Sequence, residues 1–388
     1  MPSVAERTVE YLSRLLDEVL ARAYQRVATR EFQARAVSNP LLRPLARRQA
    51  RSLFDLCAGF TYSQVLAACV RLDLLDRVRD RACTVEDLAR GAGAAEPRVR
   101  ALVDAAVALK LLRRAPAGVR LGSAGAALLG NPAVLAMIRH HDLLYADLAD
   151  PLALLGGGAS PDTRLGAFWN YAGEGAEAMA QARTCDAVAG GLDYTALMSA
   201  SQSFVADEVL RAFPFQRFSH VLDVGGGEGT FALALGGRHP GLDVTVLDLP
   251  AVAARARQRF ADLGVAPQLD ARAGDFLADP LPQGADLVTL VRVLHDHDEP
   301  TVRVLLRRVF ESLPAGGEIL VAEPMAGKRR EGGMDAYFAC YFLAMGQGRL
   351  RTPGEIAALL TDAGFRDARR YSVRMPMLVD LVSARREA

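Results

Sequence analysis

Apolar and polar positions follow two different patterns along the chain. From Ser219 to the C-terminus, short apolar runs alternate with segments of helical periodicity, which predicts a doubly wound α/β fold with a parallel sheet covered by helices on both faces. Strands are expected at 219–224, 243–248, 268–272, 285–292, 317–323, 366–373 and 377–384. Two helical stretches are expected at 335–345 and 353–363.

The region before Ser219 has a helical pattern. Residues 53–129 predict an apolar helix, a second helix that opens at Thr84, a third near Glu96-Pro97, and then a small hairpin. Three helices followed by a β wing are typical of a winged helix. Residues 131–215 are mostly helical in pattern, with an interruption at 156–164.

The first 50 residues predict an amphipathic helix broken at Asn39-Pro40 and Arg43-Pro44. Between Arg22 and Arg51 the chain has eight arginines and one acidic residue, Glu31. Two interpretations stay open. The segment is a solvated arm that docks on a partner subunit, or it is a basic strip that touches an anionic membrane surface.

Composition excludes several classes of protein. The 388 residues are 51% hydrophobic and carry 46 basic and 45 acidic side chains, so no global charge would recruit a nucleic acid. The third winged-helix segment, from Pro97 to Lys110, has too few basic residues to follow a phosphate backbone. No run approaches the roughly 18 uninterrupted apolar residues of a spanning helix. We therefore expect a soluble, cytoplasmic protein that does not bind nucleic acid.

The segment HVLDVGGGEGT is the strongest chemical signal. A strand ends at Asp223 and Val224, and the glycines that follow, with Gly225 and Gly227 among them, make a tight turn into a helix. The sixth position of a dinucleotide fingerprint is Thr230 instead of glycine, and no phosphate-loop motif is present. This pattern favours a nucleoside ligand that has no pyrophosphate.

Acidic residues follow the next two strands. Asp248 ends the second strand, where a carboxylate can accept both ribose hydroxyls. Asp275 follows the third strand, beside Phe276, and the pair suits an exocyclic amine and the face of an adenine. The alternative is that Asp248 and Asp275 are helix caps.

A histidine and a glutamate follow the fourth and fifth strands. His295 and Glu323 are expected at one edge of the sheet, where the carboxylate would orient the imidazole as a general base. His297 and Asp298 suit a helix start, while His140 and His141 suit packing or surface positions. No histidine spacing supports a metal site.

These motifs together resemble the class I S-adenosylmethionine-dependent small-molecule O-methyltransferases, over roughly residues 40–388. The resemblance implies S-adenosylmethionine as cofactor, a homodimer formed through the winged-helix portion, and a sheet of about seven strands whose last strand is antiparallel. It assigns His295 as the general base and Glu323 as its orienter. The implied cofactor contacts are Asp223, Gly225, Gly227, Asp248, Leu249, Asp275, Phe276 and Arg292.

The predicted division of the chain follows from this resemblance. It comprises an N-terminal helical arm (1–50), a winged-helix-like dimerisation domain (51–130), a helical connecting region that lines the substrate (131–210) and a cofactor-binding catalytic domain (211–388).

A narrower resemblance comes from FWNYAG, VRVLHDHDE, AEPMAG and YFLAMGQGRLRTP. These segments are similar to the bacterial hydroxyneurosporene (demethylspheroidene) O-methyltransferases, which methylate the tertiary C-1 hydroxyl of acyclic carotenoids. Where plant phenolic enzymes have a lysine and a second glutamate near the base, this chain has Val291, followed by Arg292, and Leu350. The alternatives are a phenolic, polyketide or tetrapyrrole-like acceptor, or a winged-helix regulator or scaffold that binds the cofactor without catalysis.

An aromatic stripe lies on the helix expected at 335–345. It contains Tyr337, Phe338, Tyr341, Phe342 and Met345. Core packing explains such a stripe, and so does a wall of the acceptor pocket. Weaker candidates for the same wall are Phe168, Trp169 and Met198.

Overall fold

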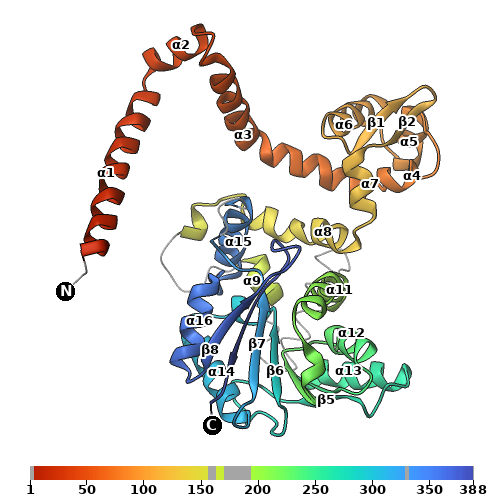
Figure 1. Cartoon of the computed structure of the whole chain (residues 1–388). Coiled ribbons are helices and arrows are strands. Elements are labelled where there is room, and N and C mark those ends of the chain that lie inside the picture. Colours follow the sequence, from red (N-terminus) through yellow and green to blue (C-terminus); the bar gives the residue numbers. More distant parts are fainter. Residues whose placement is uncertain (1–3, 156–162, 170–193, 328–331, 388) are drawn as a thin grey trace. The chain divides into compact units, whose positions relative to one another are not determined.

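The computed structural model describes residues 4–155, 163–169, 194–327 and 332–387. The chain divides into two compact units, 1–124 and 125–388 (Figure 1). The predicted boundary at residue 50 lies within a continuous helix, and the boundary at residue 210 lies within another. The finer division into four segments remains a prediction.

Three helices form the N-terminal arm: α1 (Val4–Val27), α2 (Arg30–Ser38) and α3 (Arg43–Arg71). The predicted break at Asn39-Pro40 is confirmed. The break at Arg43-Pro44 was wrong, because Pro44 occupies the first turn of α3, where a missing N–H leaves no hydrogen bond unmade. An additional break precedes α2, whose Thr29 hydroxyl accepts the Phe32 N–H at 3.3 Å.

Helix α3 is long enough and apolar enough to cross a membrane, judged by its length and composition alone. Its most apolar 18-residue window has a mean hydropathy of 1.4, and 17% of that window is buried. Polar residues interrupt the apolar run, as the sequence indicated. The exposed hydrophobic side chains near its middle include Phe54, Leu56 and Phe60.

The rest of the first unit has the predicted order of helices followed by a hairpin. Its elements are α4 (Leu74–Arg77), α5 (Val85–Ala92), α6 (Glu96–Ala108), β1 (Leu112–Ala115) and β2 (Gly118–Leu121). Thr84 caps α5, since its hydroxyl accepts the Asp87 N–H at 3.1 Å, and Gly93 ends that helix with a positive φ of 63°.

A mixed sheet of seven strands organises the second unit (Figure 1). The strands are β3 (His220–Val224), β4 (Asp243–Asp248), β5 (Leu269–Ala273), β6 (Leu287–Val291), β7 (Glu318–Glu323), β8 (Arg366–Tyr371) and β9 (Asp380–Arg385). Their order is β5-β4-β3-β6-β7-β9-β8, and β9 runs antiparallel to both neighbours. The predicted fold class is confirmed. The last strand begins at Asp380 instead of 377, because the Leu378 N–H closes a turn on the Met375 carbonyl.

Side chains of the central strands alternate between two apolar cores. Val221 packs on one face with α11 (Tyr194–Ala212), α12 (Thr230–Arg238) and α13 (Pro250–Asp262). Leu222 packs on the other face with α14 (Glu299–Ser312) and α16 (Pro353–Asp362). This alternation buries both faces of the sheet, so its polar groups gather at the strand ends.

A third apolar cluster joins α8 (Pro132–Asp147) to α15 (Gly332–Met345) and includes Leu165 of α9 (Arg164–Trp169). The other helical elements of the described residues are α7 (Ser123–Leu129), η1 (Ala153–Leu155), η3 (Phe215–Arg217) and η4 (Leu294–Asp296).

Replacing Gly229 by alanine should lower the free energy of unfolding by about 2 to 4 kcal/mol. Gly229 has a φ of +76°, and a Cβ there would come within 2.2 Å of the buried Phe260 ring. Denaturant unfolding followed by circular dichroism measures the change. Gly237→Ala is the matched control, because that glycine lies in α12 with no atom within 4 Å of its added Cβ. An equal loss in both variants would contradict the explanation.

Candidate active site

The glycine-rich loop lies between β3 and α12. Gly225 and Gly227 both have positive φ values, +70° and +60°. A Cβ on Gly226 would lie 2.3 Å from the Asp223 carboxylate, so a side chain is excluded there as well. The predicted turn is present, and a ligand can reach its backbone closely.

Asp223 lies beneath this loop and is almost fully buried. Its Oδ1 accepts the Thr289 hydroxyl at 2.7 Å, while Oδ2 has no hydrogen-bond partner among the described residues. The pKa of Asp223 is raised to about 7, mainly by burial; the Thr289 hydrogen bond opposes this rise and the Asp248 charge adds to it. The structure therefore puts this predicted cofactor residue under the loop, where it can support the turn.

Asp248 joins the end of β4 to the glycine loop. Its Oδ2 accepts the Gly227 N–H and its Oδ1 accepts the Leu249 N–H, each at 2.8 Å. The cap residue of α13 is Leu249, which makes no side-chain cap bond, so Asp248 does not cap that helix. Burial raises the pKa of Asp248, although the two backbone N–H groups oppose the shift.

Asp275 and Phe276 follow β5 and are half-buried. The Asp275 carboxylate accepts the Leu277 N–H at 2.8 Å, so it stabilises the turn that it begins; residues 274–286 contain no helix for it to cap. The Gly274 N–H donates to the Asp248 carbonyl at 3.0 Å, which holds the ends of β4 and β5 together. Phe276 meets His297 edge to face, with ring centroids 5.6 Å apart.

His295 lies in η4, which begins shortly after the end of β6, and contacts Glu323 at the end of β7. The Glu323 Oε2 accepts the His295 backbone N–H at 3.1 Å and lies 3.3 Å from Nδ1 of the ring. On the other side of the ring, Nε2 is 3.3 Å from Asp296 Oδ1. The structure thus brings together the two residues that the sequence predicted as base and orienter, and adds a second carboxylate.

Electrostatics favour the protonated form of His295. Burial lowers its pKa, but the Asp296 charge and the Glu323 hydrogen bond outweigh burial, so the pKa lies above the ordinary value. Arg292, which has a left-handed φ of +61°, opposes this rise through its charge. Its backbone N–H donates to the Ala322 carbonyl at 2.8 Å, which links β6 to β7.

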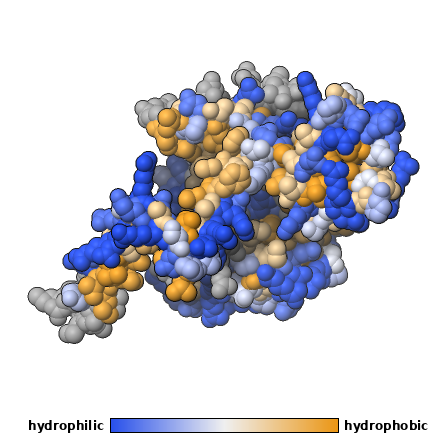
Figure 2. All heavy atoms as spheres, turned by 90° about the horizontal axis from the view of Figure 1, so that it is seen from above, coloured by the Kyte–Doolittle hydropathy of each residue, from blue (hydrophilic) through white to orange (hydrophobic). Residues whose placement is uncertain are grey.

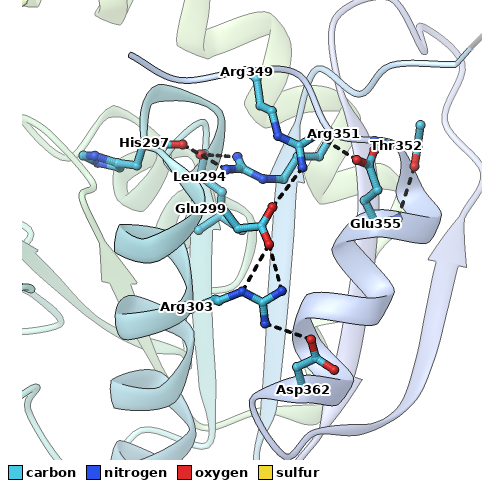
Figure 3. Close-up of polar contacts among 9 residues, drawn as sticks. All are labelled: Leu294, His297, Glu299, Arg303, Arg349, Arg351, Thr352, Glu355 and Asp362. Carbon is cyan, nitrogen blue, oxygen red and sulfur yellow. Dashed lines mark hydrogen bonds and ion pairs between the residues drawn. The ribbon is translucent and has the colours of Figure 1, made fainter. Parts of the chain in front are cut away.

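Arg351 holds the loop that carries His295, a role that sequence analysis did not find. Its side chain is fully buried and donates to the carbonyl oxygens of Leu294 and His297, at 2.7 and 2.9 Å (Figure 3). Burial lowers the pKa of its guanidinium, and the Glu323 charge opposes that shift. The two arginines of the short segment GRLRTP were the available signal.

Arg349 belongs to a more exposed network beside Arg351. It pairs with Glu299 and Glu355, and Arg303 bridges Glu299 to Asp362 (Figure 3). These contacts tie α14 to α16 at the surface.

The aromatic stripe of α15 reaches the histidine. The Phe342 ring lies 5.8 Å from that of His295 and stacks on Phe338. Tyr337 and Tyr341 continue the stripe; the Tyr337 hydroxyl is 2.9 Å from Nε2 of the half-buried His141, and the Tyr341 hydroxyl is 2.9 Å from Nε2 of the buried His140. Burial lowers the pKa of both histidines to about 4, so they are neutral at physiological pH. Met345 is buried in the same cluster.

Three weaker candidates cannot be placed in this way. The side chains of Phe168, Trp169 and Met198 lie outside the residues whose side chains the structure describes. Within the described ranges, no group of histidine, cysteine, aspartate or glutamate side chains could hold a metal ion.

Replacing Arg351 by methionine should lower the free energy of unfolding by about 2 to 4 kcal/mol, because two buried carbonyls lose their donor. Arg349→Met is the matched control and should cost less than about 1 kcal/mol, since its ion pairs are partly exposed to solvent. Chemical denaturation of both variants measures the difference. Equal effects would show that the buried hydrogen bonds are not the cause.

Comparison with known proteins agrees with this geometry. The O-methyltransferase domain family matches residues 147–366, and the O-methyltransferase dimerisation domain matches residues 54–131. Demethylspheroidene O-methyltransferase of Cereibacter sphaeroides is 42% identical over 94% of this chain and 95% of its own length. The protein of the same name from Rhodobacter capsulatus is 39% identical over 89% and 85%. The structure of human N-acetylserotonin methyltransferase in complex with SAM has a TM-score of 0.71 and 29% identity, covering 88% of this chain and 98% of that one. The chain belongs to the O-methyltransferase family.

Proposed function

We propose that this protein transfers a methyl group from S-adenosylmethionine to the C-1 tertiary hydroxyl of an acyclic carotenoid. The observation that carries the proposal is the contact of His295 with Glu323 at the sheet edge where the glycine loop also opens. Family membership supports the reaction class, and the two demethylspheroidene relatives support the acceptor. An intact base and orienter argue against a non-catalytic regulator.

The cofactor residues of the proposal fit a nucleoside ligand. A Cβ on Gly227 would project into open space, and the backbone N–H of Gly227 donates to the Asp248 carboxylate. Gly225, Gly227, Asp248 and Leu249 would hold the methionine and ribose portions. Asp275 and Phe276 would hold the adenine, and Arg292 would lie nearby. When bound, S-adenosylmethionine supplies a methyl group on a positively charged sulfur.

His295 would accept the acceptor's proton. With Nδ1 donating to Glu323, the nitrogen that can take a proton is Nε2, on the side of Asp296. A tertiary alcohol has a pKa far above neutrality, so the proton must leave as the new bond forms. Alignment of the hydroxyl oxygen with the methyl group would provide most of the remaining rate enhancement.

The α15 wall supports a hydrocarbon-like acceptor. Tyr337 and Tyr341 have their hydroxyls bound to His141 and His140, so the wall offers mainly ring surfaces. Leu350, which replaces a second acidic residue near the base, packs on the same cluster. Phe168, Trp169 and Met198 remain proposed members of this wall.

The dimerisation-domain match supports a homodimer formed through residues before about 130. We also propose that the protein is cytoplasmic and peripheral to the membrane, because an acyclic carotenoid dissolves in lipid.

Incubating the purified protein with methyl-labelled S-adenosylmethionine should label hydroxylated acyclic carotenoids such as hydroxyneurosporene. Phenols and catechols should receive little label, because the wall described above offers few free polar groups. Mass spectrometry of the products identifies the methylated hydroxyl. Labelling of catechols with none on the carotenoid would refute the acceptor and leave the reaction class intact.

His295→Ala should lower turnover by about 10² to 10⁴, the usual contribution of a general base, with cofactor affinity near wild type. Glu323→Gln should cost less, because the amide oxygen can still accept from the ring. Steady-state kinetics and calorimetry separate turnover from binding. If His295→Ala retained more than half the activity, proximity alone would explain catalysis.

The fall of kcat/KM on the acid side of its pH profile, the acid limb, should follow the protonation of His295. The base must be neutral to accept a proton and its pKa is raised, so activity should fall as pH decreases through a value above 6.5. Asp296→Asn removes the largest charge that raises this pKa, and should move the limb to lower pH. Asp298→Asn is the control, because Asp298 caps α14 and leaves the limb in place. An unshifted limb in Asp296→Asn would refute the assignment.

A further inference from the structure

The turn between α2 and α3 carries apolar and basic side chains together. We call residues 35–51 the basic corner. Leu41 is 88% exposed and Leu45 is 65% exposed, and Val37 at the end of α2 is 59% exposed. Several apolar side chains with such high exposed fractions on one short segment indicate an interaction surface.

Four arginines surround a groove in this corner. Arg43, Arg47, Arg48 and Arg51 line it with Pro40 and Pro44, and the groove has a volume of about 430 Å³. At 100° per residue, Arg43, Arg47 and Arg51 share one face of α3, and Arg48 lies between that face and Leu45, which is on the other side of the helix. The segment from Arg35 to Arg51 contains no acidic residue, so the corner offers concentrated positive charge.

We infer that the basic corner is a docking surface for an anionic lipid membrane. Lipid headgroups supply negative charge for the arginines, and the acyl region receives Leu41 and Leu45. Arginine side chains beside an inserted apolar residue keep their charge at the headgroup level. The inference adds to the proposed function, since the proposed acceptor is a lipid-soluble carotenoid. Its evidence, however, is the set of exposed residues in the basic corner.

Charge and hydrophobicity favour lipid over two other occupants. A nucleic acid would match the arginines but offers no hydrocarbon for Leu41 and Leu45. A second copy of the chain would have to cover the corner with a surface that is both acidic and apolar, or place the corner on the symmetry axis, where like charges repel. The dimerisation-domain match begins at residue 54, after the corner, where exposed apolar residues such as Phe54 and Phe60 replace the arginines.

Vesicle sedimentation of the full-length protein tests the inference. The protein should bind vesicles that contain phosphatidylglycerol much more tightly than vesicles of phosphatidylcholine alone, and added salt should weaken this binding. Equal binding to both vesicle types, or binding to neither, would overturn the inference.

Matched variants locate the surface. Replacing Arg43, Arg47, Arg48 and Arg51 by glutamine should weaken binding at least about thirtyfold at low salt. The control replaces Arg238, Arg257, Arg307 and Arg369, four exposed arginines of the other unit, and should bind like wild type. Leu41→Ser combined with Leu45→Ser should also weaken binding. An equal loss in the control, or no loss in the corner variants, would overturn the inference.

Three further measurements separate the alternatives. Light scattering should give the same mass for wild type and the four-arginine corner variant, and dissociation of that variant would assign the corner to a subunit interface. Tight binding of duplex DNA that the variant loses would assign it to nucleic acid. S-adenosylmethionine affinity and methylation of a detergent-dispersed acceptor should remain unchanged in the variant. A failure of the proposed function would instead appear in the wild-type enzyme assay.

Discussion

A carboxylate with no exposure to solvent, that of Glu323, lies at the end of a central strand. Burying such a charge costs several kcal/mol unless donors surround it. The backbone and ring of His295 supply donors at one oxygen, and the positive charge of Arg351 acts nearby. Arg351 in turn holds the carbonyls on both sides of His295. Compensation of one buried charge therefore orders the whole loop that carries the imidazole.

The glycine loop on the neighbouring strands is likewise held by buried acidic side chains at strand ends. Asp248 binds the Gly227 N–H, and Asp223 fills the space beneath Gly226. Acidic side chains at strand ends thus fix loop conformations as well as offering ligand contacts. The residues that the sequence singles out for binding are also the ones that shape the backbone around them.

Periodicity predicted most of the sheet, because buried parallel strands leave short apolar runs between helices. The strand-end position of His295 and Glu323 followed from the same pattern. Arg351 could not be found in this way, since its role depends on two main-chain carbonyls about 55 residues away in sequence. The His140 and His141 contacts with α15 are equally long-range, so the neutral state of these residues appears only in three dimensions. The predicted break at Pro44 was wrong, because a proline can begin a helix as readily as it can interrupt one.

The register of β6 and β7 has a consequence for how this enzyme can diversify. Val291 pairs with Ala322, one residue before Glu323, and this main-chain pairing sets the separation of the imidazole and the carboxylate. A slip of one residue would turn Glu323 to the opposite face of the sheet. The aromatic wall of α15, by contrast, lies on a separate helix, from which the Phe342 ring contacts that of His295. In the proposed mechanism, natural variation of α15 can therefore reshape the acceptor wall while His295 and Glu323 keep their separation, so that new acceptors become accessible through mutations outside the pair that would transfer the proton.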